Sequence, residues 1–524
     1  MKLRTIVKIA ITSSVVLLCA GFALYSFFRL SAAEGKKDFN LYELVPPSAS
    51  AVFVTDDILE FVAEVDDLAC SKNQQYLYVS KLFSYLKQSL YALSEDTPHG
   101  LSRQMNQMLI SFHEPDNERN QVLYCRLGNG DKELVNRFVR KYISSLYPPK
   151  TFIYKGEEII IYPMADGDFL ACYLTSDFMA LSFQKKLIEN VIDAYKSGKS
   201  LADDSTFTGI RAPKKSAAAA TIYTRMQGMM GWTEFDMKMK DDFIYFSGIT
   251  HDADTCFAFI NQLRQQQSVK GFPGEVLPST AFYFSRQGIT DWVSLLSYGN
   301  AQGQSVPART SEVQNRDKEF SRYLMENAGQ DLVACLFQRE DTLQGAAAVL
   351  SLSVADVTEA ERMLRALVNA ASADEGRRNP RITFCYTVNK AYPIYRLPQT
   401  TLFEQLTSFA EPTLDVYAAF YGGRLLLAPD ADALAHYIRQ LDKGEVLNGA
   451  MVYQTGMDHL SDSYHFMLMA DFDHIFQQSE NHVRFVPDFF LRNADFFRHF
   501  TLFVQFACAD GVVYPNIVLK YKSE

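Results

Sequence analysis

The sequence predicts an α+β protein, in which one N-terminal transmembrane helix precedes two tandem, related repeats of mainly antiparallel sheet with packed helices. Three observations carry this prediction. An apolar run stands near the N-terminus, four segments recur in the same order in the two halves of the chain, and strand patterns follow one another through short turns with amphipathic helices between them.

The composition of the 524 residues is that of a globular protein, with 48% hydrophobic and 21% charged residues. The 39 Phe and 28 Tyr favour strands, because aromatic side chains fit a pleated, half-buried surface. Lys and Arg number 51 against 61 Asp and Glu, so the formal net charge is −10. This acidic balance argues against a dedicated nucleic-acid binder, which needs a basic face to neutralise phosphates.

The first element is an apolar run from Ile9 to Phe28, which predicts a transmembrane signal anchor over residues 9–30. Twenty residues at a rise of 1.5 Å give about 30 Å, the thickness of the hydrocarbon core. Ser31-Ala32-Ala33 is an alternative cleavage site for a secretory signal, although such signals have shorter apolar regions. A lipoprotein signal at Cys19 is rejected, because the preceding residue, Leu18, is not small.

The charges beside the run predict its orientation in the membrane. Lys2, Arg4 and Lys8 precede it, which favours a cytoplasmic tail over residues 1–8. The chain is therefore expected to cross the inner membrane once and to place its body in the periplasm, after a linker over residues 31–41.

The recurring segments predict that the body is a duplicated unit, because four low-identity matches occur in the same order. The offsets between matched segments are roughly 225–265 residues. The matched pairs are Pro47–Val54 with Pro278–Phe284, Val122–Ser145 with Ala347–Ala370, Ala171–Gly198 with Tyr417–Gly444, and Phe235–Gly248 with His499–Lys522. We therefore expect α+β repeat 1 over residues 42–268 and α+β repeat 2 over residues 270–524, with Gln265–Ser268 in the joint.

Local patterns predict the elements within each repeat. Alternating, β-favouring residues predict strands over Thr151–Tyr154, Glu158–Tyr162, Phe178–Phe183, Asp242–Ser247 and Leu502–Ala507. A period of 3.6 residues predicts helices over Tyr76–Leu86 and Leu134–Tyr142. Asp131 and Asp356 are expected at helix starts, and Asp510-Gly511 is a favoured hairpin turn.

Motifs for catalysis are weak in this sequence. Ser197–Ser200 ends like a phosphate-binding loop, but it lacks the earlier glycine and follows a predicted helix, so Gly198 is interpreted as a helix end. Ser84 and Lys87 have the Ser-x-x-Lys spacing of penicillin-recognising enzymes, without their Lys-Thr-Gly strand. We therefore assign no catalytic, cofactor-binding or metal-ligating residues and expect no cofactor.

The cysteines favour a buried structural role. The chain has 8 of them and no Cys-x-x-Cys pair, and most stand among apolar residues, as Cys125 and Cys335 do. An oxidising compartment also permits a disulfide, whose pairing the spacing cannot give.

One polar cluster is a candidate binding site. Asp471, Asp473 and His474 follow an apolar strand pattern over Phe466–Met469. Two carboxylates and an imidazole at a strand exit could bind a divalent ion or act as acid and base. The alternative is that Asp471 or Asp473 caps the following helix.

With the anchor, the Pro-Ser strand starts and the duplicated body, the chain resembles membrane-anchored envelope proteins of Bacteroidota that carry a duplicated α+β unit. The resemblance lies in layout over nearly the whole chain, and it implies no catalytic residues. From the anchor, the duplicated body and the weakness of the catalytic motifs, we expect a non-enzymatic extracytoplasmic protein that binds or scaffolds an envelope protein or a lipid. Two alternatives stay open: a periplasmic enzyme without a known motif, and a lipid or peptide carrier with a groove between the repeats.

Overall fold

The computed structural model describes most of the chain after residue 38. The described residues are 39–72, 105–114, 119–128, 131–138, 147–164, 167–211, 218–225, 232–250, 258–296, 311–339, 346–374, 382–388, 390–407, 414–477, 486 and 488–522. The predicted anchor, the predicted helix over Tyr76–Leu86 and the Ser84–Lys87 spacing lie outside them. Among the described residues, no helix is both long and apolar enough to cross a membrane.

The structure is α+β, and within its described part twenty strands form one antiparallel sheet. The first half contributes ten strands, which follow one another across the sheet as hydrogen-bonded neighbours. In spatial order they are β4 (Lys150–Tyr154), β5 (Glu157–Pro163), β6 (Phe169–Leu174), β7 (Phe178–Ser182), β3 (Gln121–Arg126), β2 (Met108–Phe112), β1 (Ala51–Thr55), β8 (Ala220–Thr224), β9 (Thr233–Lys240) and β10 (Phe243–Thr250).

The second half continues the same sheet from β10. Its strands, again in spatial order, are β22 (Val512–Tyr521), β21 (Phe500–Ala509), β20 (Phe466–Asp471), β12 (Ala281–Gly288), β13 (Ala328–Gln338), β14 (Ala346–Val354), β18 (Arg424–Ala428), β17 (Tyr417–Tyr421), β16 (Ala391–Arg396) and β15 (Ile382–Tyr386). A separate pair, β11 (Val269–Lys270) and β19 (Ser463–Tyr464), lies beside it.

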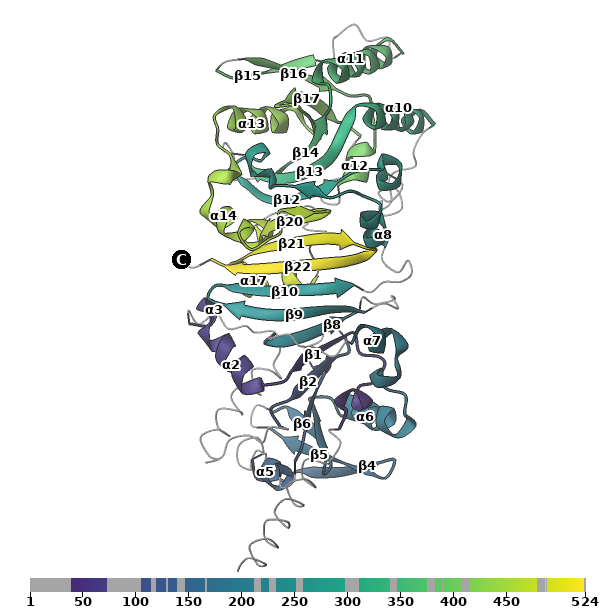
Figure 1. Cartoon of the computed structure of the whole chain (residues 1–524), viewed down its shortest axis with the longest axis vertical. Helices are drawn as coiled ribbons and strands as arrows, with labels where there is room; N and C mark the ends of the chain where they lie inside the picture. The colour runs from purple at the N-terminus through teal and green to yellow at the C-terminus, as the bar shows by residue number, and fades with distance from the viewer. Residues whose placement is uncertain are drawn as a thin grey trace, which may run out of the picture.

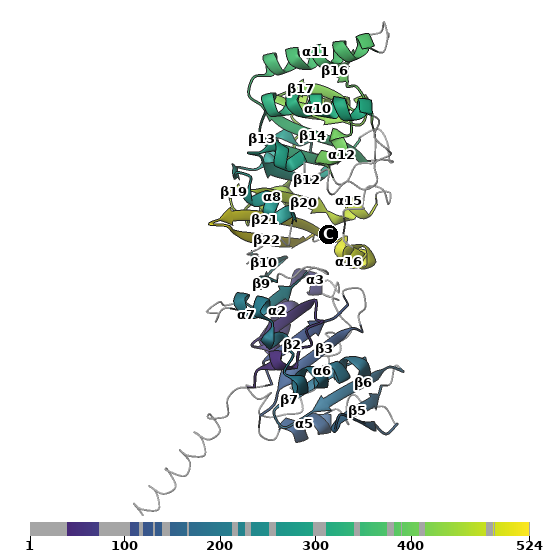
Figure 2. The same cartoon turned by 90° about the vertical axis from the view of Figure 1, so that its right-hand side faces the viewer.

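The two halves have the same strand order. If the strands of each half are numbered along the chain, leaving out β11 and β19, both halves read 4-5-6-7-3-2-1-8-9-10 from the outer edge to the joint. The joint pairs the last strand of each half, β10 with β22, from Phe243 opposite Lys520 to Thr250 opposite Val513. Figures 1 and 2 show the result as an elongated stack, with β4 near one end and β15 near the other.

Helices cover both faces of this sheet. In each half a helix follows the third and the seventh strand along the chain: α5 (Asp131–Phe138) and α6 (Lys185–Ser197) in the first half, and α11 (Val357–Asp374) and α13 (Ala431–Asp442) in the second. The other described helices are η1 (Leu41–Leu44), α2 (Ile58–Asp67), α3 (Ala69–Lys72), η3 (Leu201–Asp203), α7 (Ser205–Ile210), α8 (Ala258–Arg264), η4 (Pro273–Val276), α10 (Ser311–Asn327), α12 (Leu402–Leu406), η5 (Leu447–Gly449), α14 (Met451–Met457), α15 (Phe472–Phe476), α16 (Asp488–Arg492) and α17 (Ala494–Phe497).

Local chemistry explains where these elements begin and end. Helices α6 and α13 are followed by Gly198 (φ 61°) and Gly444 (φ 76°), left-handed conformations that glycine adopts without strain. The side chain of Asp356 accepts hydrogen bonds from the N–H groups of Thr358 and Glu359 and so caps α11. The predicted turn at Asp510-Gly511 joins β21 to β22, with positive φ at both residues.

The core is continuous on one face of the sheet. One apolar cluster spans both halves and crosses the joint, where Ile244 lies opposite Leu519. The opposite face carries one cluster per half, under α6 and under α13, and Tyr245 opposite Val518 belongs to the second of these. Because alternate residues of a strand face opposite sides, the paired strands of the joint contribute to both faces.

Residues on either side of the first predicted repeat are packed in the structure. The ring of Phe39 lies 4.8 Å from that of Phe178, and Leu41 is buried, so packing begins with the first described residues. The polar segment Gln265–Ser268, which the sequence places between the two repeats, is also packed. Gln266 is 5% exposed, and its side-chain oxygen accepts a hydrogen bond of 2.8 Å from the N–H of Thr290.

Candidate functional site

The predicted cluster of Asp471, Asp473 and His474 lies where β20 ends and α15 begins. Asp471 is the N-cap of α15, and its Oδ1 accepts a hydrogen bond of 3.0 Å from the backbone N–H of Asp473. Lys522 Nζ lies 2.7 Å from the same oxygen, and His474 Nδ1 lies 3.5 Å from Oδ2. The His474 ring is stacked on Phe282, with centroids 5.9 Å apart.

The charges of this cluster shift the pKa values of its members in opposite directions. Burial alone would raise the pKa of Asp471, but the hydrogen bonds from His474 and Lys522 lower it below its usual value. The hydrogen bond to Asp471 raises the pKa of His474, against a smaller opposing effect of burial. His474 is therefore more readily protonated than a solvated histidine.

The cluster joins three elements. It fixes the start of α15, and Lys522 connects β20 to the end of the chain after β22. Asp473 takes part through its backbone N–H. Among the described residues, no group of three or more His, Cys, Asp or Glu side chains is placed to hold a metal ion. In the structure, Asp471 caps α15, which is the helix-cap alternative that the sequence offers.

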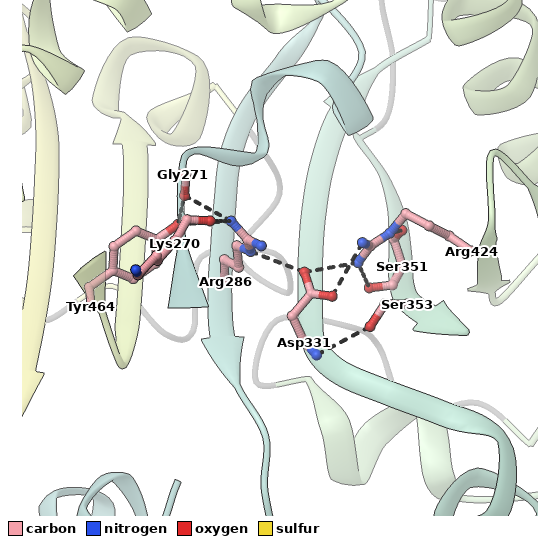
Figure 3. A network of polar contacts seen from close by, with 8 residues as sticks. All are labelled: Lys270, Gly271, Arg286, Asp331, Ser351, Ser353, Arg424 and Tyr464. Atoms are coloured by element: carbon pink, nitrogen blue, oxygen red, sulfur yellow. Dashed lines mark hydrogen bonds and ion pairs between the residues drawn. The ribbon is translucent and has the colours of Figure 1, made fainter. Parts of the chain in front are cut away.

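A second polar network lies inside the second half and was not anticipated from the sequence (Figure 3). The carboxylate of Asp331 on β13 lies between two guanidinium groups, 3.0 Å from Arg286 Nε on β12 and 3.3 Å from Arg424 Nη1 on β18. Arg424 also donates through Nε to Ser351 Oγ at 2.6 Å, and Ser353 Oγ accepts from the backbone N–H of Asp331 at 3.3 Å. Four neighbouring strands are therefore held together at one level of the sheet.

The network extends from the sheet to Gly271, which lies between β11 and η4. Arg286 Nη1 donates to the carbonyl of Gly271 at 2.8 Å, and the hydroxyl of Tyr464 donates to the same carbonyl at 2.8 Å. The Asp331 side chain is 9% exposed, and burial alone would raise its pKa, but Arg424 and Arg286 hold it below its usual value. Each charge in this set has a partner of opposite sign or a backbone acceptor, as buried charges require.

A third arrangement lies in the first half and joins a histidine to three hydroxyl groups. Ser48 Oγ is 3.1 Å from His113 Nδ1, and Ser111 Oγ is 2.9 Å from His113 Nε2. Ser111 Oγ is also 3.1 Å from the Tyr124 hydroxyl, which is fully buried. Ser48 and His113 are 65 positions apart, and no spacing motif marks them.

The Tyr124 hydroxyl and Ser111 Oγ form a hydrogen bond in which either oxygen can be the donor. The two ring nitrogens of His113 contact Ser48 and Ser111, and the tautomer of the ring decides which of them donates. Burial lowers the pKa of His113 to about 4. A neutral imidazole has one donor and one acceptor nitrogen, so His113 donates to one of its two serine partners and accepts from the other.

The described cysteines have the structural role that the sequence favours. Cys70, Cys125, Cys172, Cys335 and Cys385 are buried, and no disulfide joins the described cysteines, including Cys508. Burial raises the pKa of the Cys125 and Cys172 thiols to about 12, so they stay protonated at neutral pH. Cys19 and Cys256 lie outside the described residues.

The outer strands of the sheet expose large apolar side chains. On β4, Phe152 is 42% and Ile153 is 67% exposed. On β15, Phe384 is 54% and Tyr386 is 71% exposed. Figure 1 places β4 and β15 near opposite ends of the molecule, and exposed apolar strand edges are typical of interaction surfaces.

Comparisons with known proteins add no family to this description. No protein-family model matches the chain, and neither the curated proteins nor the solved structures contain a match.

Proposed function

We propose that this chain is a membrane-anchored protein of the cell envelope, whose extracytoplasmic body binds or scaffolds an envelope protein or lipid partner. The observation that carries the proposal is the single sheet that runs through both halves and ends on an exposed apolar strand at each end. Neighbouring strands lie about 4.8 Å apart, so twenty strands give a body about 90 Å long. A stiff body of this length is suited to holding two contacts apart.

The body is proposed to be two copies of one ten-strand unit. The identical strand order supports this, and so does the ungapped match from Ala171–Gly198 to Tyr417–Gly444. In that match both helices end at a left-handed glycine. Each copy uses its last strand to join the other and leaves the hairpin of its fourth and fifth strands at the outside.

The N-terminal run is proposed to hold the body close to the inner membrane, with residues 1–8 in the cytoplasm and the body in the periplasm. Nine residues, 30–38, lie between Arg29 and Phe39, where the packed body begins. Even fully extended, they reach at most about 35 Å. The body would therefore be confined to a layer near the membrane, where partners are membrane proteins or lipids.

The test is crosslinking in intact cells, followed by affinity purification of the full chain and of a chain that starts at residue 35. Cell fractionation and protease accessibility are measured on the same cells. We expect the full chain in the inner-membrane fraction, with protease reaching the body only after the outer membrane is opened. A reproducible partner on both chains supports contact through the body. A full chain found in the soluble fraction, or one that captures no partner, contradicts the proposal.

A further inference from the structure

The two outer strands occupy equivalent positions in the two halves. Thr151 of β4 lies opposite Ile160, which lies opposite Cys172 of β6. Ile382 of β15 lies opposite Tyr395, which lies opposite Ala418 of β17. Cys172 and Ala418 occupy the same place in the ungapped match, so the register makes Thr151 equivalent to Ile382.

The same register makes Ile153 equivalent to Phe384, and both are exposed. Hairpin β4–β5 turns at Lys155-Gly156, both with positive φ, which makes Tyr154 and Glu157 the hydrogen-bonded pair that closes the turn. Hydrogen bonding alternates along an antiparallel pair, so the N–H and C=O of Ile153 point away from β5.

The β15 hairpin leads to the same result. The N–H of Thr387 donates to the carbonyl of Lys390 at 2.9 Å, so the alternation places the N–H and C=O of Phe384 and Tyr386 away from β16. Pro393, which lies opposite Phe384, has no N–H to donate and fits a position that is not hydrogen-bonded to β15. At the two edges, Ile153, Phe384 and Tyr386 therefore combine an exposed apolar side chain with outward backbone groups.

The joint of the molecule shows what can occupy such an edge. There, the equivalent strands of the two halves pair antiparallel over Phe243–Thr250, and the sheet continues without a break. An even number of antiparallel strands leaves β4 and β15 running in opposite directions. The β15 edge of one molecule can therefore accept the β4 edge of another as its next antiparallel strand, with Phe384 beside Ile153, and aromatic and β-branched side chains form favourable cross-strand pairs.

We infer that the outer edge strand β15 of one copy of this chain pairs with the outer edge strand β4 of a second copy and so extends the sheet from molecule to molecule. Pro149 precedes β4 and has no N–H, and Lys150 is exposed beside it, so pairing is limited to about four residues per strand. Such a contact is far smaller than a standard protein interface and is weak in dilute solution. The inference rests on the proposed anchor, because confinement to a membrane raises the effective concentration of copies.

The experiment is cysteine crosslinking of the full chain in intact cells with a short bis-maleimide. The test variant is the double variant Ile153→Cys/Phe384→Cys, which places one thiol on each of the two facing strands. The single variants Ile153→Cys and Phe384→Cys lack the second thiol at this contact and serve as controls. A further matched control is Met325→Cys on α10, an apolar residue that is 45% exposed and distant from both edges in sequence and topology. The unsubstituted chain measures the background from native cysteines. We expect dimers and larger species from the double variant at about ten times the yield of the controls.

A second set of variants tests the backbone pairing directly. Ile153→Pro and Phe384→Pro remove the outward N–H groups and leave the hydrogen bonds within each hairpin intact. Together they should lower lysine-reactive crosslinking between copies about tenfold, whereas Met325→Gln, which adds no reactive amine, should leave it unchanged. Near-UV circular dichroism of each purified variant verifies that the fold is retained.

Two results would overturn the inference: edge cysteines that crosslink no better than Met325→Cys, or adducts that contain a different protein. If the chain fractionates with the membrane and captures a partner while its edges do not crosslink to each other, only the pairing of copies fails. If the chain is not membrane-anchored, the proposed function itself fails.

Discussion

Asp331 is a buried polar residue whose removal should strongly lower the free energy of unfolding. It separates two guanidinium groups whose side chains are 16% and 13% exposed, so Asp331→Ala would leave Arg286 and Arg424 facing each other without a counter-charge. Breaking a buried pair in this way costs about 3–5 kcal/mol of unfolding free energy. Urea unfolding of the wild type and the variant measures it, with Ser353→Ala, which removes one hydrogen bond worth about 1 kcal/mol, as the control. A loss no larger than that of Ser353→Ala would contradict the structural role of the ion pairs.

Asp331 should also make the free energy of unfolding depend on pH in the acidic range. The pKa of Asp331 is lower in the folded protein than its usual value, so folding favours the carboxylate. Its contribution is complete above about pH 4, the ordinary aspartate pKa, and is lost as the pH falls through the lowered folded pKa. Unfolding midpoints measured between pH 6 and pH 2 should therefore converge for wild type and Asp331→Ala at the acid end, whereas a constant gap would count against this linkage.

Two histidines should titrate on opposite sides of the ordinary value. Burial lowers the pKa of His113 to about 4, whereas the hydrogen bond to Asp471 raises that of His474 above 6.5. The contribution of His113 to stability is present above pH 6.5 and declines as the pH falls towards 4. That of His474 is complete below 6.5 and is lost as the pH rises through its raised pKa. NMR titration of the imidazole signals measures both midpoints, and Asp471→Asn should lower only that of His474.

At the scale of the elements, the helix ends are encoded by single residues. Gly198 and Gly444 have φ of 61° and 76°, and a Cβ added to either would contact no atom within 4 Å. Substitution by alanine therefore costs only the left-handed backbone conformation, about 1 kcal/mol each. Gly209 in α7 is the matched control, since it also has open space but no positive φ, and Gly209→Ala should stabilise by about 0.5–1 kcal/mol. Equal effects at Gly198 and Gly209, measured by denaturant unfolding, would contradict this account.

The elements also mark how far the sequence could lead. Hairpins and helix ends depend on neighbouring residues, so Asp510-Gly511, Gly198 and Asp356 were predicted correctly from local chemistry. The polar networks depend on residues that are far apart along the chain. Arg424 and Asp331 are 93 positions apart, and the sequence contains no period or motif that relates them. For Asp471, local chemistry allowed a cap or a binding cluster, and only the path of the chain after β20 places it as a cap.

At the scale of the whole molecule, the alternation of residues identified strands without identifying their neighbours. The pairing of β10 with β22 illustrates the reason, because Ile244 meets Leu519 across the joint although most of the second half separates them in sequence. Strand pairing is selected by the burial of side chains on both faces of the sheet. Here, the strands β10 and β22 contribute side chains to the core cluster that spans both halves on one face and to the cluster under α13 on the other face. This joint gives the molecule its elongated form in Figure 1.

The elongated form leads to a prediction in solution. A ribbon of twenty strands about 90 Å long has a radius of gyration of about 30 Å, whereas a compact domain of 524 residues would have about 24 Å. Small-angle X-ray scattering of a chain that starts at residue 39 should give the larger value at low protein concentration. Because the joint is made of paired strands with core on both faces, the halves should not move as separate bodies, and the value should not change with salt. A radius near 24 Å would contradict the continuous sheet, and a radius that varies with salt would indicate that β10 and β22 separate in solution.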